Sequence, residues 1–112
     1  MQLISLVYTN RPLAFNEMGR FKKYVFYSDA KGLVKGDMII SPMYNTPLQV
    51  YKTELDSKEV VGYDPKYLVI DKIIKKPTGD RIQNILLKRE FIINHTTEIV
   101  EEEDSHWIPL NF

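Results

Sequence analysis

The sequence predicts a single β-rich domain, a small antiparallel barrel or strongly twisted sheet with at most one or two short helices. Short runs that alternate apolar and polar residues, rich in aromatic and β-branched side chains, recur along the chain. Gly, Pro, Asp and Asn separate these runs at short intervals, as turns between strands require. The 112 residues suit one domain, 1–112, whose core needs no disulfide or metal.

The first elements are expected to form a central strand and a cover for one end of the barrel. Gln2–Tyr8 carries apolar side chains on both faces, which is typical of a strand that is covered twice. Asn10–Gly19 is interpreted as a loop or short helix, because Asn10 can cap a helix and Gly19 can end one. This segment would carry Phe15 and Met18 over one barrel end.

The stretch Lys22–Lys52 is predicted to form a meander of three strands. The strands are expected at Lys22–Ser28, Met38–Ser41 and Leu48–Lys52. The turns between them contain Asp29-Ala30-Lys31-Gly32, Lys35-Gly36-Asp37 and the pair Asn45 and Pro47. A meander buries one face, so it must curl into a barrel or find a cover.

A resemblance rests on this stretch, which runs Tyr-Val-Phe-Tyr-Ser-Asp, then Leu-Val-Lys-Gly-Asp-Met-Ile-Ile-Ser-Pro, then Leu-Gln-Val. It resembles small uncharacterised proteins of phages and prophages of low-GC Gram-positive bacteria. The strand that begins after Gly36-Asp37 is also similar to strands of Src-homology-3-like β-barrels. The resemblance covers Lys22–Lys52, under a third of the chain. It implies a small barrel, a phage origin and a place in the host cytoplasm, and it carries over no catalytic residue.

The second half is expected to add more strands. Thr53–Lys58 is interpreted as a loop and Val60-Val61 as a short strand. Lys66–Lys75 alternates strongly and predicts one long strand. Lys76–Asp80 contains Pro and Gly and is interpreted as a hairpin turn.

Arg81–Asn94 has two competing patterns. One set of residues has helical spacing: Ile82, Ile85, Leu86 and Arg89. Another set alternates as a strand does: Ile85, Leu87, Phe91 and Ile93. The β-branched end of the segment favours a strand paired with Lys66–Lys75. Thr96–Glu101 is expected to add a strand, followed by an apolar tail at Trp107–Phe112.

The composition argues against several functional classes. The chain has no cysteine, which excludes disulfides, thiol catalysis and thiolate metal sites and fits a cytoplasmic protein. No signal peptide or membrane-spanning run is visible. Phosphate loops, nucleophile elbows and metalloprotease helices are absent from the sequence, so we expect no enzyme and no cofactor. His95 and His106 lack zinc-ligand spacing, so no metal site is expected.

Charge is balanced in total but unevenly distributed. The chain has 15 basic and 15 acidic side chains. Residues 66–89 are mainly basic, whereas the acidic and aromatic C-terminal segment 95–112 contains Glu101-Glu102-Glu103-Asp104. The acidic run is interpreted as a solvated turn or as a segment that neutralises the basic hairpin. Binding of a cation, or mimicry of phosphate toward a basic partner, is the alternative.

The functional hypothesis is a non-catalytic interaction protein that binds and modulates a host protein. Aromatic side chains are typical anchors of protein interfaces. The candidate partner-binding residues are Tyr24, Tyr27, Tyr44 and Tyr51 in the meander, and Trp107 and Phe112 near the end of the chain. The C-terminal aromatics would alternatively close their own barrel. Exposed strand edges would also allow a homodimer.

The alternative hypothesis is a small nucleic-acid-binding β-barrel. Its phosphate contacts would come from the basic 66–89 hairpin: Lys72, Lys75, Lys76, Arg81, Lys88 and Arg89. Tyrosines of the meander would stack on bases, as aromatic residues do in single-strand binders. The zero net charge argues against this hypothesis, because nucleic-acid binders usually have a positive excess.

Overall fold

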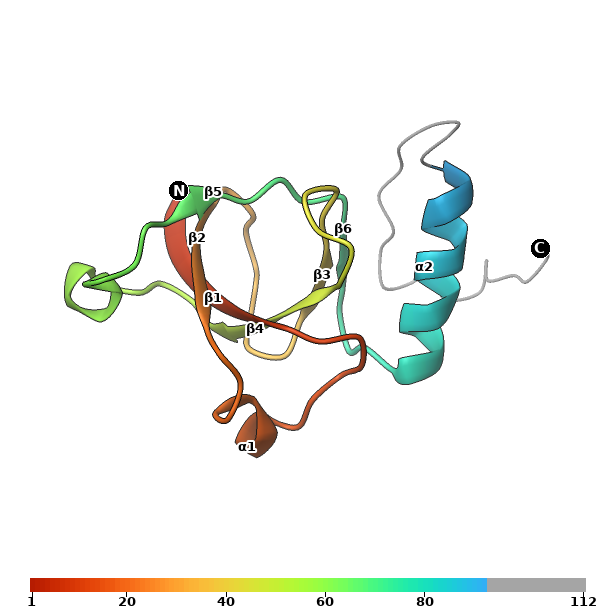
Figure 1. The fold of residues 1–112 in the computed structure, drawn as a ribbon, viewed down its shortest axis with the longest axis horizontal. Coiled ribbons are helices and arrows are strands. Elements are labelled where there is room, and N and C mark those ends of the chain that lie inside the picture. Colours follow the sequence, from red (N-terminus) through yellow and green to blue (C-terminus); the bar gives the residue numbers. More distant parts are fainter. Residues whose placement is uncertain (93–112) are drawn as a thin grey trace.

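The computed structural model describes residues 1–92 and shows a mainly β fold (Figure 1). Its elements are β1 (Gln2–Tyr8), α1 (Phe15–Met18), β2 (Tyr24–Ser28), β3 (Met38–Ile40), β4 (Leu48–Lys52), the 3₁₀ helix η1 (Ser57–Val60), β5 (Lys66–Tyr67), β6 (Lys72–Ile74) and α2 (Gly79–Ile92). The strands curl around a common interior, and α2 stands beside β6. The predicted fold class is therefore confirmed.

β1 lies in the middle of the sheet, as its two apolar faces predict. The strand order is β5-β2-β1-β4-β3-β6. β1 pairs antiparallel with β2, where Ile4 faces Phe26, and antiparallel with β4, where Leu6 faces Val50. The pairing of β2 with β5 is parallel, and the other pairings in the described sheet are antiparallel.

The three strands predicted in Lys22–Lys52 form, but the predicted meander is wrong. β3 pairs with β4 through Met38 and Gln49, whereas β2 pairs with β1 and β5. β1 thus separates β2 from β4. The physical reason is that β1 is apolar on both faces, so the central place in the sheet buries more of it than an edge would.

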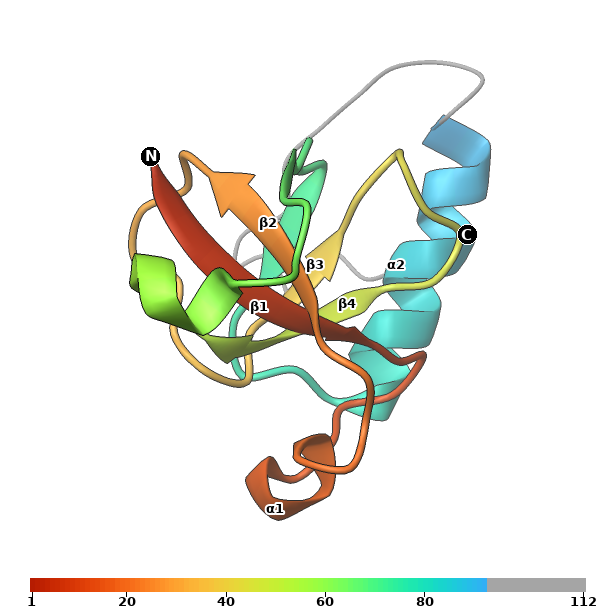
Figure 2. The same ribbon diagram turned by 60° about the vertical axis from the view of Figure 1, so that its left-hand side comes forward.

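Three groups of buried side chains hold the fold together. The interior of the curled sheet contains Ile4, Leu6, Phe26, Leu33, Ile39, Leu48, Val50 and Leu68. A second group joins the sheet to α2 and contains Met38, Ile40, Ile74, Ile82 and Ile85. The third consists of Val7, Leu13 and Met18, which places α1 against β1. Met18 is buried as predicted, whereas the Phe15 side chain is 57% exposed. Figure 2 shows α1 projecting from the connection between β1 and β2.

Lys66–Lys75 is not one strand, contrary to the prediction. β5 and β6 lie at opposite edges of the sheet, and residues 68–71 cross between them. The crossing is fixed at both ends by backbone hydrogen bonds. The Leu68 N–H donates to the Tyr27 carbonyl at 2.9 Å, and the Asp71 N–H donates to the Ile40 carbonyl at 2.8 Å. Leu68 is buried in the sheet interior. Burial of Leu68 therefore favours a break over a continuous strand.

The predicted strand at Val60-Val61 is wrong as well, because Val60 ends the 3₁₀ helix η1. Asp56 caps this helix: its Oδ1 accepts hydrogen bonds from the N–H groups of Lys58 at 2.9 Å and Glu59 at 3.1 Å. A capped turn satisfies its backbone donors locally, so the segment needs no strand partner.

The segment Arg81–Asn94, predicted as a strand, is helical through Ile92, and the predicted hairpin turn Lys76–Asp80 leads into the helix. Thr78 starts the helix: its Oγ1 accepts from the Arg81 N–H at 3.2 Å, and its carbonyl accepts from the Ile82 N–H at 3.0 Å. Ile82 and Ile85 pack on the sheet.

The predictions for Thr96–Glu101 and Trp107–Phe112 lie outside the described residues. Over residues 1–92, neither α-helix has the length and apolar character to cross a bilayer.

Candidate functional site

Four tyrosines line an open pocket beside the ends of β1 and β2. The pocket has a volume of about 490 Å³, and its tyrosines are Tyr8, Tyr24, Tyr44 and Tyr63. We call it the tyrosine pocket. It brings together tyrosines that lie up to 55 positions apart in the sequence, from Tyr8 to Tyr63.

Sheet register explains how three of these rings meet. Tyr24 begins β2 and faces Leu6 in the antiparallel ladder, so Tyr8, two residues after Leu6, lies on the same face of β1. The Tyr8 and Tyr24 ring centroids are 4.3 Å apart, and those of Tyr8 and Tyr44 are 5.4 Å apart. Phe26 approaches Tyr44 edge-on at 5.9 Å. These tilted and edge contacts are favourable geometries for aromatic rings.

The turn between β3 and β4 holds Tyr44 at this position. The Tyr44 N–H donates to the Ser41 carbonyl at 3.3 Å, and the Ser41 hydroxyl accepts from the Met43 N–H at 3.1 Å. The end of β1 is tied to the same turn, because the Thr9 N–H donates to the Pro47 carbonyl at 3.0 Å. These hydrogen bonds therefore hold the backbone positions from which the Tyr8 and Tyr44 side chains extend.

The environment of Tyr8 keeps its phenol neutral. Burial raises the pKa of Tyr8 to about 12, and the hydrogen bond with Tyr44 acts in the same direction. The phenol therefore stays available for hydrogen bonding throughout the physiological range.

A titration followed by the ultraviolet absorbance of tyrosinate is expected to show one tyrosine ionising near pH 12, because the pKa of Tyr8 is about 12. Tyr8→Phe should remove this step. In the unfolded state the Tyr8 pKa returns to about 10. The folded state then keeps the proton longer, so the stability from this site is complete below pH ~10 and is lost as the pH rises through about 12. The urea-unfolded protein is the control. An identical high-pH step in the Tyr8→Phe variant would contradict the assignment.

Positive charge surrounds the tyrosine rings. The Lys22 ammonium lies 5.1 Å from the centre of the Tyr24 ring. Lys66 also lines the pocket, and Asp64 is its acidic residue. Lys23 lines it too, but its ammonium donates to the Gly19 carbonyl at 2.6 Å and lies 4.7 Å from the centre of the Tyr51 ring. Lys22 and Lys66 against Asp64 leave an excess of one positive charge at the rings, so the pocket favours an anionic or acidic ligand.

Of the predicted partner-binding residues, the structure brings Tyr24 and Tyr44 together in this pocket. Tyr27 is exposed on β2 and pairs with Tyr67 of β5. Tyr51 is half-buried against the buried group under α1. These two tyrosines therefore belong to other surfaces. Trp107 and Phe112 lie outside the described residues.

The sequence analysis missed Tyr8 and Tyr63 as site residues. Tyr8 shares a face with Ile4 and Leu6, so its position at the open end of this row was a usable signal. Tyr63 had no comparable signal. It follows Gly62, whose φ of +89° is accessible chiefly to glycine and directs the chain out of η1.

The predicted nucleic-acid-binding residues do not form a basic hairpin. Lys72 is only 1% exposed, and Lys75 donates to Asp37 Oδ2 at 2.5 Å. The Arg81 guanidinium donates to the Lys75 carbonyl at 2.6 Å, and Lys76 is exposed. The side chains of Lys88 and Arg89 lie outside the described part of the structure. Lys72, Lys75 and Arg81 thus contribute to the packing and hydrogen bonding of the fold.

Among the residues that the structure describes, no three His, Asp or Glu side chains form a group able to hold a metal ion. His95 and His106 lie outside that range. Comparison of the chain with protein-family models, curated proteins and solved structures finds no match. The resemblance to phage proteins and to Src-homology-3-like barrels accordingly stays an expectation from the sequence.

Proposed function

We propose that the protein is a non-catalytic binding module that engages a segment of a host protein through the tyrosine pocket. One observation carries the proposal: four tyrosines from four separate parts of the fold converge on an open pocket bordered by lysines. The phage origin that the sequence resemblance implies makes a host protein the expected partner, and binding would modulate that protein.

Tyrosine suits this task for a physical reason. Its ring contributes a large apolar area at a small cost in conformational entropy, and its hydroxyl supplies a hydrogen bond. In the tyrosine pocket the rings of Tyr8, Tyr24 and Tyr44 are already packed together, so binding would order few side chains. Tyr63 is 47% exposed and offers area that a partner would bury.

The charges specify the partner further. The excess positive charge of Lys22 and Lys66 over Asp64 favours a segment with acidic residues. The aromatic rings favour an apolar or aromatic anchor beside those acids. We therefore propose an acidic peptide segment with one aromatic side chain as the ligand.

Binding of single-stranded nucleic acid is the second candidate, because tyrosine rings and lysines also suit bases and phosphates. The predicted phosphate-binding lysines argue against it. Lys72 is buried and Lys75 is paired with Asp37, so neither extends a basic surface toward the tyrosine pocket. We favour the protein ligand for this reason.

Selection from a displayed random-peptide library is expected to enrich acidic peptides with an aromatic residue. Tyr63→Ala and Tyr24→Ala should each weaken the selected peptides at least tenfold in Kd, because truncation of an aromatic anchor typically costs more than about 1.4 kcal/mol. Fluorescence anisotropy with labelled peptides measures the change.

Tyr67→Ala is the matched control, since Tyr67 is 48% exposed and lies outside the tyrosine pocket. It should leave the Kd unchanged. Equal losses for Tyr63→Ala and Tyr67→Ala would argue against the pocket. Salt-sensitive gel shifts with a single-stranded oligonucleotide, without any enriched peptide, would favour the nucleic-acid candidate.

A further inference from the structure

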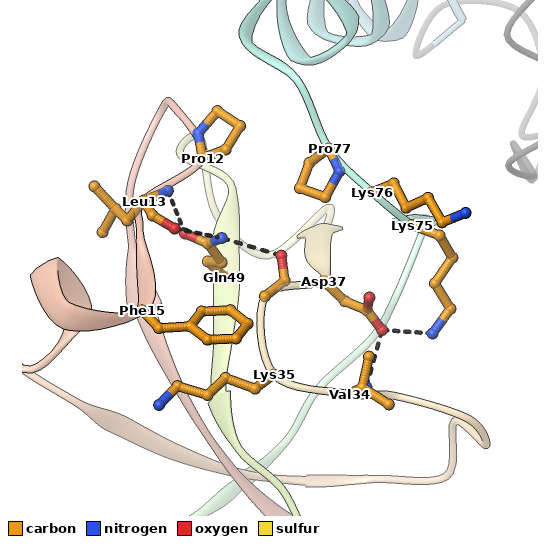
Figure 3. A pocket seen from close by; sticks show the side chains of 11 residues that line it. Pro12, Leu13, Phe15, Val34, Lys35, Asp37, Gln49, Lys75, Lys76 and Pro77 are labelled. Carbon is orange, nitrogen blue, oxygen red and sulfur yellow. Dashed lines mark hydrogen bonds and ion pairs between the residues drawn. The ribbon is translucent and has the colours of Figure 1, made fainter.

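A second pocket lies between α1, the β2–β3 connection and the segment that precedes α2. It has a volume of about 560 Å³, and its walls include Pro12, Phe15, Val34 and Pro77 (Figure 3). We call it the Phe15 pocket. Its residues Lys35 and Lys75 do not line the tyrosine pocket, and the two pockets share no lining residue.

A buried glutamine fixes the floor of the Phe15 pocket. Gln49 is 2% exposed, and its side chain accepts from the Leu13 N–H at 2.8 Å. The same side chain donates to the Gly36 carbonyl at 3.0 Å and to the Leu13 carbonyl at 3.3 Å. These bonds join Leu13, which precedes α1, to Gly36, which precedes β3. The two walls of the pocket that these residues belong to therefore have a fixed separation.

Phe15 supplies an aromatic surface to the pocket. Figure 3 shows its ring reaching toward the space between Gln49, Lys35 and Asp37. Gly36 has a φ of +101°, and a Cβ at that position would lie 2.9 Å from Phe15 Cε1, so the ring lies directly against this glycine. The Phe15 side chain is nevertheless 57% exposed. An exposed aromatic ring that lies against the Gly36 backbone offers a stacking surface for a planar ligand.

The Phe15 pocket also contains a buried carboxylate with one free oxygen. The Asp37 side chain is 5% exposed, and its Oδ2 accepts from the Val34 N–H at 3.0 Å and from Lys75 Nζ at 2.5 Å. Among the described residues, no hydrogen bond reaches Asp37 Oδ1. A buried acceptor without a donor is costly, so this oxygen is suited to accept from a ligand.

The surrounding charge is positive. Lys35, Lys75 and Lys76 line the Phe15 pocket with Asp37 as the acidic residue, which leaves an excess of two positive charges. Lys35 Nζ lies 5.1 Å from the centre of the Phe15 ring, so one ammonium is close to the stacking surface. Lys75 uses two of its three donors, on Asp37 and on the Gly32 carbonyl at 2.5 Å. Lys76 is exposed.

We propose that the Phe15 pocket binds a small planar aromatic molecule that carries an amino donor and an anionic group, the chemistry of an aminopurine nucleotide. The ring stacks on Phe15, and the amino group donates to Asp37 Oδ1. The anionic group is attracted by Lys35 and Lys76. This ligand satisfies the stacking surface, the free carboxylate oxygen and the positive charge together.

Isothermal titration of the full chain with adenosine 5′-monophosphate tests the proposal. We expect saturable binding at least tenfold tighter than that of adenosine, which lacks the anion, or inorganic phosphate, which lacks the ring. Purine riboside 5′-monophosphate lacks the amino group and should bind roughly tenfold more weakly, the effect of one lost hydrogen bond. An aromatic carboxylate with a ring amino group, such as aminobenzoate, distinguishes nucleotide binding from binding of any ligand of this chemistry.

Phe15→Ala should weaken binding of adenosine monophosphate at least tenfold, and Lys76→Gln should weaken it severalfold. Phe21→Ala and Lys58→Gln are the matched controls, because both residues are exposed and lie outside the Phe15 pocket. Far-ultraviolet circular dichroism checks that each variant is folded. No saturable binding of either aromatic anion, equal binding of adenosine and its monophosphate, or an unchanged Kd in Phe15→Ala would overturn the proposal.

Discussion

Replacing Gln49 by leucine is expected to lower the free energy of unfolding by about 3 kcal/mol, since each buried backbone group left without a partner costs about 1–3 kcal/mol. Gln49 is 2% exposed and makes three hydrogen bonds with the backbone of Leu13 and Gly36. Leucine has a similar volume but cannot bond to these groups. The substitution therefore isolates the polar contribution of the side chain.

Urea unfolding followed by circular dichroism measures this loss, and Gln83→Leu is the matched control. Gln83 is exposed on α2, so its substitution should change the free energy of unfolding by less than about 0.5 kcal/mol. The variants should unfold with the same dependence on urea, because the surface exposed on unfolding is similar. Equal stability of the two variants would show that Leu13 and Gly36 find other partners.

The strands of the first half could be predicted because their signals are local. Gln2–Tyr8 and Leu48–Lys52 have the same bounds in the prediction and the structure. Alternation of apolar and polar residues places side chains on two faces whatever the partner strand is. The choice of partner has no such local signal. β1 enters between β2 and β4, and this long-range pairing is what the predicted meander missed.

The break within Lys66–Lys75 is a second case where distant contacts override a local pattern. Alternation in this segment fits a strand, yet Leu68 turns inward to the sheet interior and the chain crosses to the other edge. The buried position of Leu68 depends on Phe26, Val50 and other residues far away in the sequence. A pattern read within a window of ten residues does not contain this information.

The sequence predicted that tyrosines would form the candidate site, but it predicted only some of the tyrosines that line it. Tyr24 and Tyr44 were expected to bind a partner, and both line the tyrosine pocket. The basic residues show the opposite outcome. Lys75 pairs with Asp37, which is 38 residues earlier, so its role follows from a contact that no spacing in the sequence reveals.

The two patterns in Arg81–Asn94 make a prediction that separates helix from strand. In α2, Ile85 is 1% exposed and packs against the group containing Met38, Ile40 and Ile74, whereas Leu87 is 63% exposed. Ile85→Ala is expected to lower the free energy of unfolding by about 3 kcal/mol, because it leaves a cavity in this group. Leu87→Ala should change it by less than about 0.5 kcal/mol.

The pair is informative because the alternating pattern places Ile85 and Leu87 on one face of a strand, where both substitutions would be costly. The helical period separates the two residues by about 200°, so only one of them faces the sheet. Urea unfolding of both variants measures the two losses under identical conditions. Similar large losses for Ile85→Ala and Leu87→Ala would contradict the helix, whereas a loss confined to Ile85→Ala would support the packing of α2 on β3 and β6.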